Sequence, residues 1–145
     1  MSNINKPNKF LPTTKEEMKQ RGWDELDVVL ITGDAYIDSP FMGIAVVGRI
    51  LEDIGLRVGI IGQPDVNSDI DIKRMGEPKL FWGVSGGSID SMVSNYTATK
   101  RYRSTDDYTP GGKNDKRPDR ATLVYTNLIR RYFKNTVPIV LGGIE

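Results

Sequence analysis

The sequence predicts a three-layer α/β domain, in which helices cover both faces of a mostly parallel sheet of about four strands. Three short apolar runs, each followed by a turn of small residues, lie at 28–31, 79–84 and 137–141. Segments with apolar residues at helical spacing separate them. Strands that alternate with helices in this way are joined by crossovers, so they are expected to lie parallel.

The first 26 residues are predicted to be an N-terminal arm with a short helix, and residues 27–145 the α/β domain. A threonine stands three residues before a glutamate at 13–16 and again at 14–17, a pattern typical of a capped helix start. The glycine at position 22 is expected to end this helix.

The opening unit of the domain is a strand, a loop and a helix. Residues 28–31 form an unbroken β-branched-rich run, which is typical of a strand covered on both faces. Gly33 and Asp34 break the run, and Ser39 followed by Pro40 predicts a helix start. Gly55 is expected to end that helix.

The rest of the chain predicts three more strands and three helices. Strands are expected at 57–62, 79–84 and 137–141, and helices at 69–76, 89–96 and from about 119 to 134. Because a doubly wound domain covers its last strand with a further helix, the domain is expected to be incomplete at its C-terminal end.

Composition narrows the function classes. The 145 residues include no cysteine and no histidine, which excludes disulfides, a thiolate nucleophile, Ser-His-Asp catalysis and ordinary zinc or iron-sulfur ligation within this segment. The formal charge of +1 gives no general argument for nucleic acid or an anionic membrane. No apolar run is long enough to cross a bilayer, so a cytoplasmic protein without membrane partners is expected.

Three strand ends are predicted to meet at one edge of the sheet, and they are the candidate ligand site. Glycine lets the backbone approach a ligand, and helix N-termini near Ser39 and Ser88 favour an anion or a polar oxygen. The alternative is that these glycines only permit tight turns. The candidate cofactor-binding residues are Gly33, Asp34, Asp38, Ser39, Ser85, Gly86, Gly87, Gly142 and Gly143.

Neither a P-loop nor a dinucleotide-binding glycine fingerprint is present, which argues against the usual nucleotide sites. Asp34 and Asp38 could accept hydrogen bonds from ligand hydroxyls or contact a metal. Carboxylates in a turn more often cap their own backbone, and this is the favoured interpretation. No catalytic residue and no metal ligand is assigned.

A long loop at 97–120 combines basic and aromatic residues. Loops of this length in a compact domain are usually functional or disordered. Arg101, Arg103 and Arg117 could contact phosphates, but aspartates dilute the charge of the loop. Nucleic acid is therefore an unlikely partner, and a docking surface for a following domain is favoured.

The stretches DVVLITGDAYIDSPFMGIAVVGRILEDIGLRVGIIGQPD, LFWGVSGGSIDSMVSNYTATKRYRSTDDYTPGG, KRPDRATLVYTNLIRRYF and VPIVLGGIE resemble the amino-terminal region of YgiQ-type radical S-adenosylmethionine (SAM) proteins. That region is similar to the Rossmann-like cobalamin-binding domains that precede radical SAM barrels. The resemblance covers the chain from Phe10 onward. It implies a full-length protein that holds a [4Fe-4S] cluster and cleaves SAM to a radical.

Two departures limit what the resemblance carries over. The three-cysteine cluster motif cannot occur here, and the histidine that ligates cobalt in one class of cobalamin domains is also missing. The resemblance therefore implies an accessory, substrate-positioning domain that is not catalytic alone, with its own radical SAM barrel and an unknown substrate as partners. The alternatives are a cobalamin-like cofactor-binding module and RNA binding through residues 100–120.

Overall fold

The computed structural model of the protein describes residues 10–37 and 43–145. Four strands, β1 (Val28–Thr32), β2 (Val58–Gly62), β3 (Phe81–Ser85) and β4 (Ile139–Gly142), form one sheet in the order β2-β1-β3-β4. All three pairings are parallel. The predicted α/β class with a parallel sheet of about four strands is confirmed.

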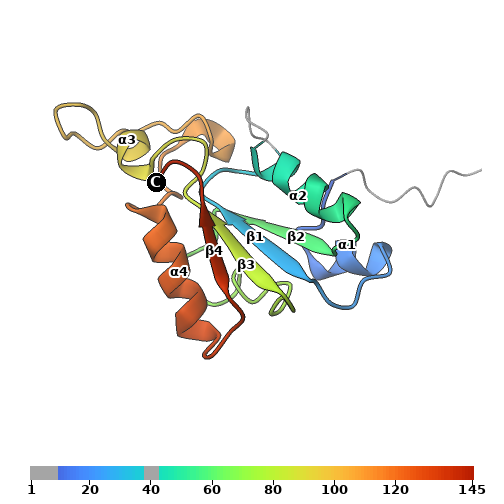
Figure 1. The fold of residues 1–145 in the computed structure, drawn as a ribbon. Helices are drawn as coiled ribbons and strands as arrows, with labels where there is room; N and C mark the ends of the chain where they lie inside the picture. Colours follow the sequence, from blue (N-terminus) through green and yellow to red (C-terminus); the bar gives the residue numbers. More distant parts are fainter. Residues whose placement is uncertain (1–9, 38–42) are drawn as a thin grey trace, which may run out of the picture.

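Helices lie on both faces of this sheet (Figure 1). The helix α2 (Gly43–Asp53) contacts β1 and β2 on one face, and α4 (Ala121–Tyr132) contacts β3 on the other. Side chains of a strand alternate between the two faces, so two apolar cores result. Val28, Leu30 and Ile60 belong to the core beside α2, and Trp82 and Tyr125 to the core beside α4. The arrangement is the predicted three-layer, Rossmann-like one.

The N-terminal arm contributes to both cores. Its helix α1 (Lys15–Gln20) has Thr14 as N-cap, whose hydroxyl accepts a hydrogen bond from the Glu17 amide at 3.3 Å, as the capping pattern predicts. Leu11 is buried in the core beside α2, and Met18 and Leu26 are buried in the core beside α4. The arm therefore closes both sides of the sheet at this end.

The predicted helix at 69–76 is wrong, because this segment forms a series of turns. Local side-chain bonds favour turns over a continuous helix there: the Asp71 carboxylate accepts from the Asp65 amide at 2.8 Å. Ile72 and Met75 are nevertheless buried, so the segment still packs its apolar side chains against the core.

The helix predicted at 89–96 is shorter in the structure, and its apolar side chains face solvent instead of the core. The helix α3 (Ser91–Asn95) begins after Asp90, whose carboxylate caps the Met92 and Val93 amides. Met92 and Val93 are exposed, while Ser91, Ser94 and Asn95 are buried. The apolar spacing did not predict the buried face because polar contacts, not apolar packing, hold this helix.

The long loop contains one short 3-10 helix, η1 (Pro110–Gly112), and leads into α4 through Arg120 in the left-handed region at φ 51°. The start of α4 agrees with the prediction that Asp119 or a nearby residue begins this helix. The Asp119 carboxylate accepts from Asn95 Nδ2 at 2.8 Å and from the Tyr96 hydroxyl at 2.7 Å. In the part of the chain that the structure describes, no helix has the length and apolar character that a membrane span requires.

Candidate functional site

The ends of β1, β3 and β4 lie side by side, as the sequence predicted. Thr32 pairs in register with Ser85, and Ser85 with Gly142. The Gly33 amide continues the pairing by donating to the Ser85 carbonyl at 3.2 Å. A Cβ on Gly33 would overlap the Gly86 carbonyl oxygen, so the first two strand-end loops touch through their backbones. Glycine at 33 is needed for this contact.

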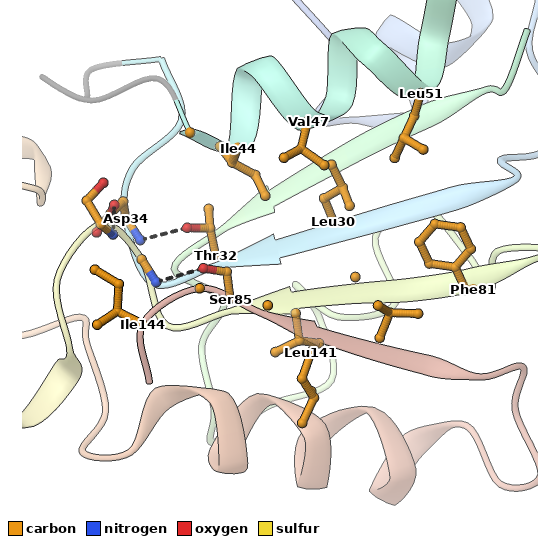
Figure 2. A pocket seen from close by; sticks show the side chains of 18 of the residues that line it. Leu30, Thr32, Asp34, Ile44, Val47, Leu51, Phe81, Ser85, Leu141 and Ile144 are labelled. Atoms are coloured by element: carbon orange, nitrogen blue, oxygen red, sulfur yellow. Dashed lines mark hydrogen bonds between the residues drawn. The ribbon is translucent and has the colours of Figure 1, made fainter. Parts of the chain in front are cut away.

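A pocket of about 500 Å³ lies between α2 and the sheet at these strand ends (Figure 2). Its walls are mostly apolar: Leu30 and Phe81 rise from the sheet, and Ile44, Val47 and Leu51 come from α2. At the strand ends it is lined by polar residues, which are Thr32, Asp34, Ser85 and Ser88. The predicted crevice, expected to favour an anion or a polar oxygen, is thus an apolar pocket with one polar end.

Hydroxyl groups supply free donors at that polar end. Thr32 Oγ1 accepts from the Asp34 amide at 3.2 Å, and Ser85 Oγ accepts from the Gly87 amide at 3.1 Å (Figure 2). Each hydroxyl serves as an acceptor in these bonds, so its own O–H can still donate. The polar end is suited to a ligand group that accepts hydrogen bonds.

Both carboxylate oxygens of Asp34 accept hydrogen bonds from other groups of the protein. The residue is 5 % exposed. Its Oδ1 accepts from Arg117 Nη2 at 2.6 Å, and its Oδ2 accepts from the Ser88 amide at 2.7 Å. A carboxylate whose two oxygens are both occupied in this way fixes the positions of neighbouring loops. Asp34 is thus a positioning residue at the pocket wall.

Arg117 connects three loops from inside the protein. Besides Asp34, its Nη1 donates to the Gly86 carbonyl at 2.6 Å, and its Nε lies 3.4 Å from Asp106 Oδ2. The side chains of Arg117 and Asp106 are both fully buried. Asp106 also accepts from the Thr109 hydroxyl at 2.9 Å, which ties the network to the long loop.

The sequence did not reveal this role of Arg117. Its neighbours Lys116 and Arg120 are exposed, and the run KNDKRPDR reads as a solvated basic segment. Arg117 and Asp34 are 83 residues apart, so no local spacing connects them. The burial also removes Arg117 from the proposed RNA-binding surface, of which Arg101 and Arg103 remain exposed.

The remaining predicted site residues take several places. Gly86 lies against the Glu145 side chain, whose Oε1 accepts from the Ser91 hydroxyl at 2.6 Å. Gly87 and Gly143 both have positive φ, 114° and 101°, so their turns favour glycine. Gly142 lines the pocket with open space around it. Asp38 and Ser39 lie outside the described residues.

The residues that the structure describes do not form a cluster or metal centre. The sequence has no cysteine to ligate a [4Fe-4S] cluster, and residues 10–37 and 43–145 contain no group of three potential metal ligands.

Tyr125 lies fully buried in the core beside α4, and burial raises the pKa of its phenol far above the usual range. It therefore stays protonated at neutral pH and cannot act as a general base.

Comparison with known proteins identifies the family. The family model described as Radical SAM N-terminal matches residues 10–145. A UPF0313 protein of Thermotoga petrophila is 62% identical over 136 residues, which are 94% of this chain and 24% of the relative. A UPF0313 protein of Pseudomonas aeruginosa is 54% identical over 139 residues, 96% of this chain and 18% of the relative.

The chain thus spans about a quarter of these curated relatives, or less. No solved structure matches it. The family match covers every strand and helix of the sheet domain as well as the strand-end pocket. The protein therefore belongs to the Radical SAM N-terminal family.

Proposed function

We propose that this domain is an accessory domain of a radical SAM protein and positions a small molecule in the strand-end pocket. The observation that carries the proposal is the pocket itself, which is about 500 Å³ in volume and is lined at one end by residues from the carboxyl ends of parallel strands. Ligands of open α/β sheets bind at this edge, and this volume lies in the range of small-molecule sites.

The lining of the pocket selects the class of ligand. Leu30, Val47 and Phe81 provide apolar walls, while the Thr32 and Ser85 hydroxyls can donate at one end. The nearby Asp34 carboxylate disfavours an anionic head group. The ligand is a mainly apolar, uncharged molecule with a hydrogen-bond acceptor, such as a carbonyl, at one end.

The radical chemistry belongs to other parts of the longer protein. Family membership implies a [4Fe-4S] cluster and SAM in a full-length member, and this chain contains no cysteine to hold such a cluster. What this domain contributes is binding and orientation. A pocket built on strand ends and braced by the buried Arg117 network holds a ligand in a fixed place.

The pocket is tested with prodan, a neutral naphthalene dye that carries a carbonyl group and fluoresces more strongly in apolar surroundings. The variant Gly142→Phe is designed to fill the pocket, because Gly142 lines it and a Cβ added at this position meets no atom within 4 Å. The control Leu123→Phe adds the same ring on the exposed face of α4.

We expect saturable prodan binding to the purified chain, weakened at least about tenfold by Gly142→Phe and unchanged by Leu123→Phe. Equal binding to all three proteins, or none to any, would contradict the pocket assignment. A parallel titration with aquacobalamin tests the cobalamin alternative. A change in its visible spectrum that Gly142→Phe abolishes would favour a cobalamin module over the proposed ligand class.

A separate experiment tests whether this chain alone can bind an iron-sulfur cluster and cleave SAM. The purified chain is incubated anaerobically with iron, sulfide and a reductant, and then assayed for cluster absorbance and for cleavage of SAM. We expect neither signal, since carboxylates and backbone groups alone do not hold such a cluster. A stable cluster on this chain would overturn the accessory role and leave the pocket result intact.

A further inference from the structure

The solvent side of α2 carries an apolar stripe. Ile50 is 58 % exposed, and Val46 and Val47 are about half exposed; Ile54, which directly follows the helix, is 70 % exposed. A surface helix normally presents polar residues to water, but the charged residues of α2 are limited to Arg49, Glu52 and Asp53. In α2 the only fully buried residue is Gly48, which packs against Leu11. This helix therefore has a second apolar side without a cover among the described residues.

The apolar surface continues from α2 onto the sheet. Val140 of β4 is in register with Gly83, whose face is that of Leu30 and α2. Val140 is 51 % exposed, and Ile144 beyond the strand is 75 % exposed. Figure 1 shows α4 on the opposite face and α2 displaced towards β2. The sheet is thus bare above β4 on the α2 side.

The strand β4 also has a free edge. Its only strand neighbour within 10–37 and 43–145 is β3. Exposed strand edges attract further pairing, and natural proteins protect them with charges, prolines or a covering segment. The four residues of β4, IVLG, include neither a charge nor a proline. A bare edge beside a bare apolar face marks a surface that another part of a protein covers.

We propose that α2 and the bare face of β4 form the docking site for a segment of the chain that follows this region in longer family members, seated as an amphipathic helix. The matched region is N-terminal in its family and makes up only 18–24% of the relatives, so most of their chain follows it. A tethered segment docks at high effective concentration, which favours it over a separate partner.

The chemistry of the surface defines the occupant. Val46, Ile50, Ile54 and Val140 are aliphatic and uncharged, so the docked helix presents apolar residues at i, i+3 or i+4, and i+7. Val47 and Val140 also line the pocket, so a helix seated on them covers this part of the ligand site. The docking site shares these two residues with the pocket, whereas Val46, Ile50 and Ile54 belong to the docking site alone.

The test uses a chimera in which residues 10–145 replace the matching region of the Thermotoga petrophila relative. The photo-crosslinking amino acid p-benzoylphenylalanine is placed at Ile50, or at Leu123 on the opposite face as a control. Mass spectrometry then locates the cross-linked peptides. We expect position 50 to cross-link within the same chain to a peptide after the matched region, and position 123 to give no such product.

Cross-links from position 50 to a second copy would overturn the proposal in favour of a homodimer, and an absence of cross-links would overturn it outright. Hydrogen–deuterium exchange of the unmodified relative is the second measurement, should the chimera fail to fold. The peptide aligned with α2 should exchange more slowly in the full chain than in the isolated matching region. Equal exchange in the two contradicts docking.

A double variant separates docking from folding and from ligand binding. Ile50→Glu with Ile54→Glu should abolish the slow exchange of α2 in the chimera, whereas Leu123→Glu should not. In the 145-residue chain the same pair should leave the urea midpoint and prodan binding unchanged, because neither side chain is buried or lines the pocket. Lost prodan binding with intact docking would instead count against the proposed function.

Discussion

Arg117 shows how one buried side chain can organise a site. Its guanidinium reaches Asp34 and the Gly86 carbonyl in two strand-end loops, and Asp106 in its own loop at 97–120. Buried ion pairs add little net stability compared with well-packed apolar residues, but removing one partner is costly because the other charge stays buried. The network is best understood as fixing loop positions around the pocket.

Replacing Arg117 should therefore destabilise the protein strongly. Arg117→Met leaves the Asp34 and Asp106 carboxylates buried without their cation, and we expect a loss of about 3–5 kcal/mol in the free energy of unfolding. Urea denaturation followed by circular dichroism measures it. Arg101→Met, at an exposed position, is the control and should change stability by less than about 0.5 kcal/mol. Equal effects would show that the network is not structural.

A second ion pair, at the other end of β1, predicts a response to acid. The side-chain hydrogen bond from Arg57 lowers the pKa of Asp27 from 3.8 to about 2. Because the folded-state pKa lies below the ordinary value, the pair stabilises the fold above about pH 4, and this contribution is lost as the pH falls through about 2.

Asp27→Asn should thus lower the free energy of unfolding at neutral pH, by about 1 kcal/mol once solvent screening is allowed for. The difference from the unmodified protein should shrink between about pH 4 and pH 2. Urea midpoints at a series of pH values measure it. The exposed Asp107→Asn serves as control, and a difference that persists at pH 2 would contradict the assigned cause.

At the scale of elements, the strand-end loops are held together by close backbone contact and polar hydrogen bonds rather than by apolar packing. The Gly33 and Gly86 backbones touch, and the Gly87 amide reaches back to Ser85. The helix α3 follows the same rule: its buried side chains are polar, and the Asn95 amide group donates to the Arg117 carbonyl at 3.1 Å. Small and polar residues therefore build this edge of the sheet.

Replacement by alanine should destabilise the protein at one glycine of this edge and have little effect at another. In Gly33→Ala the added Cβ would overlap the Gly86 carbonyl, so the loops must separate, and we expect a loss of about 1–3 kcal/mol or more. In Gly142→Ala the Cβ enters open space and should have little effect. Thermal unfolding of both variants measures the difference. Similar melting temperatures would refute the close approach of the first two loops.

At the scale of the molecule, the N-terminal arm packs at the β2 edge of the sheet, while the β4 edge has no neighbouring strand among the described residues. Leu11 fills the space between α2 and the sheet, and the Leu11 amide donates to the Tyr36 hydroxyl at 2.9 Å. The Ile60 amide of β2 donates to the carbonyl of Pro12 in the arm at 3.0 Å. The arm and the domain share their cores and should unfold together.

Truncating Leu11 tests this shared core. Leu11→Ala removes a fully buried side chain that Gly48 and Ile60 surround, and we expect a loss of about 2–5 kcal/mol in the free energy of unfolding. The neighbouring Phe10→Ala, at a side chain 47 % exposed, should cost less. Equal losses, or a separate early transition for the arm, would show that the arm folds apart from the domain.

The sequence alone determined the class of the fold, the four strands, the convergence of their ends and the family resemblance. Those features rest on local patterns: apolar runs, glycine turns such as Gly142-Gly143, and helical spacing. Only the tertiary structure decided that Arg117 is buried against Asp34, that the crevice is mainly apolar, and that α2 has a bare apolar side. These depend on contacts between distant residues, which no local spacing encodes.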